Sequence, residues 1–330
     1  MKKTILFLLV AFVALVSEVK AQDPHFSQFY ANPLYINPAL AGANVCPRVN
    51  LTYRDQWPSL GAFKTFTFSY DQYFDFLSGG IGVIVLNDKQ SETYSNTSAS
   101  LMYSLRLKLT RKIFLNLALQ ASVANRSLDW DNLTFGDMID PRYGFIYSTQ
   151  AQSPGKDNLS NTYADFSTGA VVYGENWYGG VAFAHLTQPD DGFYSYNRLP
   201  LKTTIHGGIK FNISRDKRRT NAFFGAPIIS PNVIYHYQGG FQDLNYGLYL
   251  DWSPFIVGAW FRQAISFENA DAFVFMIGVQ QDSFKVGYSY DLTVSSLSNV
   301  SGGAHEITLG LQFNCPEKRR KIKSIDCPSF

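Results

Sequence analysis

Apolar and polar residues alternate with a period of two along the stretch IFLNLALQASVANR, residues 113–126. The odd positions from Ile113 to Val123 are all apolar, and the even positions from Asn116 to Arg126 are small or polar. Successive side chains of a strand point to opposite sides, so the pattern predicts a β-strand with one apolar and one wet face. Soluble sandwiches and membrane barrels both contain such strands. This stretch alone therefore does not decide whether the apolar face meets protein or lipid.

The same alternation recurs along the chain in runs of about 9 to 12 residues, the length of a tilted strand that crosses a bilayer. The pattern predicts fourteen strands, at residues 48–57, 65–71, 80–87, 94–105, 113–126, 162–173, 177–186, 202–213, 228–237, 242–251, 255–262, 271–280, 283–290 and 305–314. An even number of strands returns the chain to its starting side, as in the closed up-and-down barrels of bacterial outer membranes.

The connections between these strands fall into two classes. Residues 174–176, 252–254 and 281–282 form short turns, and residues 127–161, 187–201 and 291–304 form long segments. If the first strand starts in the periplasm, these short turns lie on the periplasmic side and the long segments lie outside, which is typical of outer-membrane barrels. We therefore expect an all-β protein whose residues 47–314 form a transmembrane antiparallel barrel, with extracellular loops and with both chain ends in the periplasm.

The composition supports a barrel and excludes other classes. Charged residues and aromatic residues each make up 16% of the chain, and the mean hydropathy is −0.09. Beyond the first twenty residues no run approaches the roughly 18 apolar residues of a membrane helix. The formal net charge of +2 indicates no polyanionic partner, and no basic groove with interleaved aromatics points to nucleic acid.

The chain opens with the pattern of a secretory signal peptide over residues 1–21. Residues 22–46 then form an extended segment in which Pro24, Pro33 and Pro38 prevent a long helix or a paired strand. Its many large apolar groups indicate that it is bound to something, either the barrel lumen as a plug or a periplasmic partner as a latch, and lumen or rim packing is the simpler interpretation. The candidate plug or partner residues are Asp23, Phe26, Phe29, Tyr30, Asn32, Pro33, Tyr35, Asn37 and Pro38.

Three cysteines lie outside the predicted strands. Cys46 precedes the first strand and Cys315 follows the last, and these two strands are neighbours in a closed barrel. A Cys46–Cys315 disulfide would join them, but Cys315 could equally pair with Cys327 within the tail, residues 315–330. No cysteine or histidine spacing indicates a zinc site, and we expect no metal or cofactor.

Catalysis has little support in the sequence. The five histidines are scattered, and no nucleophile elbow accompanies them. Some membrane-embedded hydrolases assemble a triad across strands, which spacing would not reveal. We expect a protein that is not an enzyme.

Several blocks resemble one known family. They are QDPHFSQFYANPLYINPALAG at 22–42, RDQWP at 54–58, FSYD at 68–71, ADFSTGAVVY at 164–173, AHLTQP at 184–189, GYSYDLTVSSL at 287–297, SGGAHEITLGLQF at 301–313 and CPSF at 327–330. Together they resemble the PorP/SprF family from the signal peptide to the last residue.

The resemblance implies an integral outer-membrane component of the type IX secretion system of Bacteroidota, which exports proteins bearing a C-terminal sorting domain and in some species supports gliding motility. Family members are thought to work with periplasmic ring and peptidoglycan-binding components, or as dedicated partners of a secreted surface adhesin. The resemblance carries over no catalytic residue.

Two groups of residues are candidates for partner binding. The basic link 214–220 and the basic tail could dock secretion machinery in the periplasm through Arg215, Lys217, Arg218, Arg219, Lys318, Arg319 and Arg320, although the link could simply be solvated. The long loop could bind a cargo or adhesin through Trp130, Phe135, Tyr143 and Phe145, although each could instead pack the loop over the barrel mouth.

The alternative function is a diffusion porin. A porin needs an open, charged lumen, whereas the expected inward residues are largely small and uncharged, such as Ser98, Ser100, Ser104, Ser122 and Thr308. Fourteen strands enclose enough space for a plug or for a narrow channel. The sequence leaves permeability open.

Overall fold

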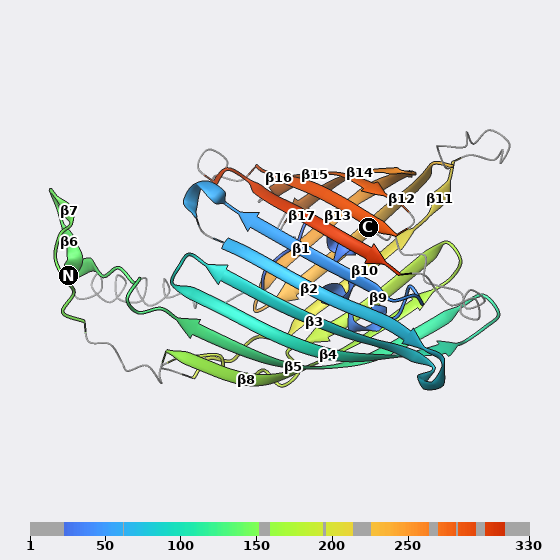
Figure 1. The fold of residues 1–330 in the computed structure, drawn as a ribbon, viewed down its shortest axis with the longest axis horizontal. Helices are drawn as coiled ribbons and strands as arrows, with labels where there is room; N and C mark the ends of the chain where they lie inside the picture. The colour runs from blue at the N-terminus through green and yellow to red at the C-terminus, as the bar shows by residue number, and fades with distance from the viewer. Residues whose placement is uncertain are drawn as a thin grey trace, which may run out of the picture.

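The computed structural model describes residues 23–61, 63–151, 159–193, 196–213, 226–263, 270–281, 283–294 and 301–313. Within these residues fourteen long antiparallel strands form one closed barrel, as the alternation predicts (Figure 1). They are β1 (Arg48–Gln56), β2 (Phe63–Phe74), β3 (Gly79–Gln90), β4 (Tyr94–Lys108), β5 (Phe114–Leu128), β8 (Ser160–Tyr173), β9 (Trp177–Ala184), β10 (Lys202–Ile209), β12 (Ile228–Gln238), β13 (Phe241–Trp252), β14 (Phe255–Gln263), β15 (Ala270–Gln280), β16 (Phe284–Thr293) and β17 (Ala304–Gln312).

The barrel closes between its first and last strands. β1 pairs with β17 over its whole length, from Arg48 opposite Gln312 to Gln56 opposite Ala304. On the far side β10 pairs with both β9 and β12. In the described part of the chain each long strand therefore has two neighbours, and this pairing satisfies backbone groups that would be costly to leave unsatisfied in lipid.

Three short strands complete the strands of the described residues. The strand predicted at 202–213 is interrupted at Lys210, whose N–H donates to the Asn176 carbonyl, and it continues as β11 (Phe211–Asn212) beside β12. β6 (Ile139–Asp140) and β7 (Gly144–Phe145) form a small hairpin within the long loop that follows β5. Figure 1 shows this hairpin projecting well beyond the wall.

The connections sort by length, with some exceptions. The predicted short turns, such as 174–176, lie at one end of the barrel, which we call the short-turn end. The strand ends that precede and follow residues 129–159, 185–201 and 294–303 all lie at the other, which we call the long-loop end. Tight turns also occur at the long-loop end, as at Gly239–Gly240, and the connection 210–227 at the short-turn end is long.

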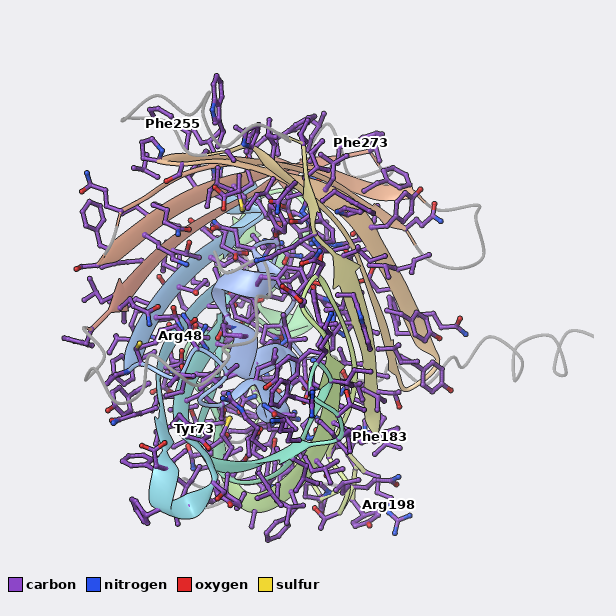
Figure 2. All side chains as sticks on the ribbon, turned by 90° about the vertical axis from the view of Figure 1, so that its right-hand side faces the viewer. Arg48, Tyr73, Phe183, Arg198, Phe255 and Phe273 are labelled. Atoms are coloured by element: carbon purple, nitrogen blue, oxygen red, sulfur yellow. The ribbon has the colours of Figure 1, made fainter. Side chains whose placement is uncertain are left out.

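The outward face of the wall is apolar around the barrel. On β5 the odd positions predicted to be apolar point outward, and Leu119 is 70% exposed. Phe255 and Phe273 on the opposite side also point away from the barrel axis (Figure 2). A surface of such side chains belongs in hydrocarbon. The structure thus shows an integral outer-membrane barrel.

No helix among the described residues has the length and apolar character needed to cross a membrane.

Residues 23–46 lie inside the barrel, where the ribbon of this segment fills the ring of strands (Figure 2). The segment forms only single turns, η1 (Phe29–Ala31), α2 (Pro33–Ile36) and η2 (Pro38–Leu40). Pro33 and Pro38 each occupy the first turn, where a missing N–H does no harm. The two prolines thus mark where α2 and η2 begin.

A hydrophobic core inside the barrel joins the segment to the wall. Phe29, Tyr30, Ile36 and Leu40 of the segment pack against inward residues that include Trp260. The Phe29 and Trp260 rings are 5.3 Å apart between centroids. Burying a large apolar side chain stabilises a fold by about 1.5–3 kcal/mol. The segment is therefore held as a packed part of the fold.

Candidate functional site: the occupied barrel lumen

A buried ion network ties the start of the segment to the wall. The carboxylate of Glu306 on β17 accepts hydrogen bonds from the backbone N–H groups of Ser27 and Gln28 at 2.7 and 3.0 Å. Arg54 on β1 lies 3.1 Å from Glu306 and 2.9 Å from Asp291 on β16. All these groups are almost fully buried. A buried carboxylate of this kind is tolerable only because cations and N–H groups surround it.

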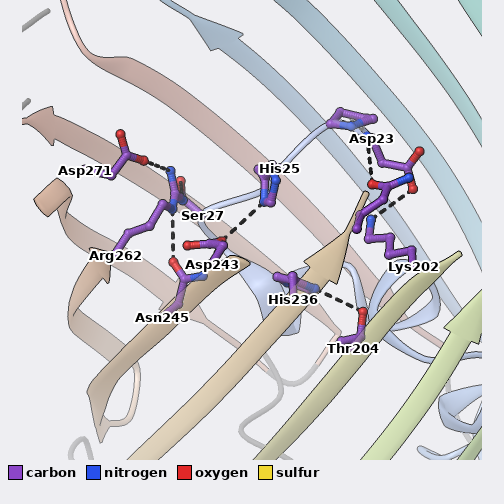
Figure 3. A network of polar contacts seen from close by, with 12 residues as sticks. Asp23, His25, Ser27, Lys202, Thr204, His236, Asp243, Asn245, Arg262 and Asp271 are labelled. Atoms are coloured by element: carbon purple, nitrogen blue, oxygen red, sulfur yellow. Dashed lines mark hydrogen bonds and ion pairs between the residues drawn. The ribbon is translucent and has the colours of Figure 1, made fainter. Parts of the chain in front are cut away.

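The Ser27 side chain is the centre of the same network. Its hydroxyl donates to Asp291 at 2.6 Å and accepts from Arg54 at 2.6 Å and from Arg262 at 3.2 Å. Arg262 on β14 also bonds Asn245 at 3.0 Å, as Figure 3 shows. Ser27 thus joins strands β1, β14, β16 and β17, and Arg262 extends the network to β13.

Two histidines lie beside this network. His25 of the segment is 3.5 Å from Asp243 on β13. His236 on β12 is 3.0 Å from the Thr204 hydroxyl on β10, and its ring packs edge-on against that of His25 (Figure 3). These contacts extend the polar network from β13 to β10.

Asp23, the first described residue, belongs to a second charged group. We call this group the entrance cluster, and it consists of Asp23, Asp165, His185 and Lys202. Asp23 Oδ2 accepts from His185 Nε2 at 3.0 Å and from Lys202 Nζ at 3.1 Å. His185 Nδ1 donates to Asp165 Oδ2 on β8 at 2.8 Å. Because both ring nitrogens face carboxylates, the imidazolium form suits this site.

The ionisation of the entrance cluster follows from these contacts. Burial alone would lower the pKa of His185, but the Asp23 and Asp165 carboxylates outweigh it and raise the pKa to about 9. Burial would likewise raise the pKa of Asp23, but Lys202 and His185 hold that pKa well below its usual value. Near neutral pH the cluster therefore holds three ion pairs, two made by His185 and one between Lys202 and Asp23.

The side-chain amide of Asn37 holds the middle of the segment against the wall. Asn37 is fully buried, and its Nδ2 donates to the carbonyls of Ala170 on β8 and Val181 on β9 at 3.2 and 3.1 Å. Its Oδ1 accepts from the Ala39 N–H at 2.9 Å and so begins η2. Gly169 on β8 faces this amide, and a Cβ there would overlap the Asn37 oxygen.

The end of the segment reaches the short-turn end. Gly42 N–H donates to Asp71 on β2 at 2.9 Å, and Arg48 makes a two-pronged contact with the same carboxylate. Gly42 has φ of +66°, and its Cα lies so close to Gly80 on β3 that neither position has room for a Cβ. Further along, Asn44 donates to Gln312 at the end of β17 at 2.6 Å.

The segment therefore traverses the lumen from one end to the other, and this corrects one expectation. We expected the mature N-terminus at the end opposite the long loops. Asp23, the first described residue, instead contacts His185 and Lys202, which flank the loop 185–201 at the long-loop end. The segment is bonded to the entrance cluster through Asp23 and to Asp71 near the short-turn end through Gly42. It therefore crosses the barrel before the chain enters β1.

A cavity remains between the segment and one side of the wall. It has a volume of about 120 Å³, and it reaches the entrance cluster and the side chains of β4, β5 and β8. It exists because the inward residues there are small, and Ser98, Ser100 and Ser122 are among them, as the sequence predicts. Ser104 and Thr308, also predicted to face inward, bond the segment instead, through Ala39 and Gln28.

The lumen is more charged than the sequence analysis expected. Arg54, Arg262, Asp291 and Glu306 all point inward, but each is paired with another charge or with the segment. Sequence reasoning overlooked them because it treated each strand alone. The available signal was an ionisable residue at an inward position of a strand, as Arg54 is in the alternation of β1, in a chain with few charges.

The other candidate residues have different outcomes. The candidate plug residues, from Asp23 to Pro38, all lie in the lumen and are largely buried. Trp130 and Phe135 contact each other with ring centroids 5.1 Å apart, whereas Tyr143 and Phe145 on the β6–β7 hairpin are 75% and 63% exposed. Cys46 is in a disulfide, but Cys315, Cys327, the signal peptide and the basic link and tail residues lie outside the described residues. The pairing and the docking role stay predictions.

Among the described residues, no group of three or more histidine, cysteine, aspartate or glutamate side chains is placed to hold a metal ion.

Comparison with known proteins places the chain in a family. The model of the type IX secretion system membrane protein PorP/SprF matches residues 18–311. The chain belongs to the PorP/SprF family. This protein is thus a membrane protein of the type IX secretion system, as the resemblance implied.

Eighty-nine chains of solved structures match this PorP/SprF protein. It is similar to outer membrane protein Omp33 of Acinetobacter baumannii at 11% identity, over 82% of this chain and 100% of that one, with a TM-score of 0.45. The toluene transporter TbuX of Ralstonia pickettii is 8% identical over 85% and 93% of the two chains, with a TM-score of 0.47. The KdgM porin is 6% identical over 81% and 99%, with a TM-score of 0.36. No curated protein matches in sequence.

Proposed function

We propose that this PorP/SprF protein is a non-enzymatic part of the type IX secretion machinery that acts by binding other proteins at the two ends of a closed barrel. The observation that carries the proposal is the occupied lumen, in which residues 23–46 are bonded to the wall near both ends and in the middle. A lumen filled in this way leaves the rims and loops as the working surfaces. We take the long-loop end to face the exterior and the short-turn end to face the periplasm.

The β6–β7 hairpin is the surface that we assign to a secreted cargo or adhesin. Asp140 accepts hydrogen bonds from the N–H groups of Arg142 and Tyr143 at 2.8 and 3.0 Å and so gives the hairpin tip a defined shape. Tyr143 and Phe145 are exposed on it. Exposed aromatic residues on an ordered hairpin are typical anchors of protein interfaces, because they bury much area while losing little conformational entropy.

At the short-turn end we assign periplasmic ring or peptidoglycan-binding components to the basic link 214–220 and the basic tail 315–330. The support is the charge in the sequence, which includes Arg218 and Arg320, together with the family. Cations near a rim attract an acidic partner surface and speed its association.

Two variants test the assignment at each end separately. Tyr143→Ser with Phe145→Ser should lower surface attachment of the cargo while the level of folded barrel is unchanged. Removal of residues 316–330, which keeps Cys315, should lower export and copurification of the periplasmic components. Asn87→Ala, which removes a bond of 2.7 Å to Thr97 on the wall, is the control. Normal export and attachment in both variants, at normal barrel levels, would refute the proposal.

A diffusion porin is the second candidate, and the cavity beside the segment favours it. The cavity reaches the entrance cluster and is lined by hydroxyl groups that water could follow. Liposome swelling with the purified barrel separates the two functions. Swelling by small sugars at rates typical of porins would support the porin, and the absence of swelling supports the closed barrel.

A further inference from the structure

Asp23 sits in the entrance cluster as an anion would sit in a binding site. Its Oδ2 receives hydrogen bonds from two cationic groups, His185 Nε2 at 3.0 Å and Lys202 Nζ at 3.1 Å. Lys202 Nζ also donates to the Tyr35 hydroxyl at 3.3 Å. Two cations converging on one oxygen are a common way for proteins to hold a carboxylate.

The wall groups that hold Asp23 are themselves fixed. Asp165 binds the other ring nitrogen of His185 at 2.8 Å, and the Thr187 hydroxyl also contacts this carboxylate, at 3.4 Å. His185 has φ of +60°, a left-handed backbone conformation that is uncommon for residues other than glycine. This conformation turns the chain directly after β9. Strain of this kind persists where the surroundings enforce it, and it often marks a functional site.

The charge of the cluster depends on Asp23. His185 and Lys202 carry two positive charges, and Asp165 and Asp23 carry two negative charges, so the four groups sum to zero. If Asp23 left, the wall alone would keep one net positive charge among buried groups. Leaving a buried charge unpaired is unfavourable, so the vacated site would take up another anion.

There is room for a larger ligand beside this anion site. The cavity of about 120 Å³ touches Asp23, Asp165, His185 and Lys202, and it lies in the half of the lumen nearer the long loops. Asn96 on β4 also lines it, and the buried Asn96 Oδ1 has no hydrogen-bond partner in the described part of the chain. A carboxylate on a peptide would suit both the cationic groups and Asn96. The carboxylate would bind His185 and Lys202, and a backbone N–H of the peptide could donate to Asn96 Oδ1.

We propose that His185 and Lys202 form a carboxylate-binding site, which Asp23 occupies in this structure and which takes up a carboxylate of a partner polypeptide entering from the long-loop end. Asp23 is then an internal ligand that is exchanged for the partner. The exchange frees the beginning of the segment, while Glu306 still holds Ser27 and Gln28. This inference rests on the proposed binding function and names the chemical group that the barrel recognises.

The test uses the purified full-length barrel in detergent and two fluorescent probes, dansyl-triglycine with a free carboxylate and its C-terminal amide. Asp23→Asn removes the internal competitor and should tighten binding of the acid probe by about tenfold or more, as for a site that Asp23 occupies about nine-tenths of the time. Adding Lys202→Met should abolish that gain. Asn87→Ala, which removes a hydrogen bond to Thr97 on the wall and no charge, should leave binding as in the wild type.

The amide probe and inorganic phosphate distinguish this site from other kinds. Equal binding of the acid and amide probes, or phosphate competing as well as the acid probe, would overturn the proposal. No binding of the acid probe by the Asp23→Asn barrel, with circular dichroism and heat modifiability like the wild type, would also overturn it. Because the assay contains no secretion component, its failure is distinct from a failure of the export experiments.

Discussion

The substitution Glu306→Gln should loosen the N-terminal segment selectively. Glu306 is fully buried and accepts the N–H groups of Ser27 and Gln28 while it pairs with Arg54. Glutamine has nearly the same shape, so packing is preserved. It cannot, however, accept all three donors as a carboxylate does, and it leaves Arg54 with Asp291 as its remaining charged partner.

The size of the effect follows from the charge-assisted hydrogen bonds and the ion pair that the substitution removes. Each hydrogen bond to a charged group contributes about 1.5–3 kcal/mol, and breaking a buried pair costs about 3–5 kcal/mol. Asp291 retains part of the interaction with Arg54, so we expect the opening of the segment to become easier by about 3 kcal/mol. At about 1.4 kcal/mol per factor of ten, the opening equilibrium of the segment should rise by roughly 100-fold.

Amide hydrogen exchange read by mass spectrometry measures this opening directly. Peptides covering residues 27–46 should exchange roughly 100-fold faster in the variant, while peptides from β4 and β5 keep their rates. Asp88→Asn is the matched control, since Asp88 is a buried acidic residue that bonds Thr65 and Gln90 on the wall. If the segment exchanged at the wild-type rate in Glu306→Gln, the network would not be what holds it. Equal acceleration in the wall peptides would mean that the whole barrel, and not the segment, had been weakened.

Three further perturbations probe other levels of the structure. Gly169→Ala places a methyl group against the Asn37 amide and should weaken packing by about 1–3 kcal/mol, seen as faster exchange around residue 37. Deprotonation of His185 should destabilise the fold: because its pKa is raised from 6.5 to about 9, its contribution is full below pH 6.5 and is lost as the pH rises through 9. Urea titrations at pH 7 and pH 10 measure this loss. Between these pH values the free energy of unfolding should fall by about 2–3 kcal/mol more in the wild type than in His185→Gln. An equal fall in the two proteins would contradict the prediction. Leu119→Arg, on the lipid face, should cost about 2–4 kcal/mol in folding titrations into liposomes, and Gln120→Arg, which points into the cavity, should cost less.

The strands of the wall were predictable from the sequence because the alternation of apolar and polar residues lies within each strand. Each strand carries its own alternation, as residues 113–126 do, and a period of two fixes which side chains meet lipid and which meet the lumen. Strand ends were less exact: the strand expected at 65–71 spans Phe63–Phe74. Turn residues do not show where pairing with the neighbouring strand stops, because that depends on the partner.

The path of residues 23–46 was only partly predictable. Prolines and large apolar groups marked the segment as bound and irregular, and the lumen was the favoured place. Its direction was not visible, because contacts such as Ser27 with Glu306 join residues 279 positions apart. For the same reason the charged groups that hold it, Arg54, Asp291 and His185, could not be recognised as partners before the barrel was closed.

Single-channel conductance in a planar bilayer tests the central claim, that a lipid-facing barrel is closed by its own N-terminal segment. We predict that the wild type shows no steady open channel and that deletion of residues 23–42 produces one, since fourteen strands enclose space for a narrow pore. A stable conductance in the wild type equal to that of the deletion variant would contradict the account.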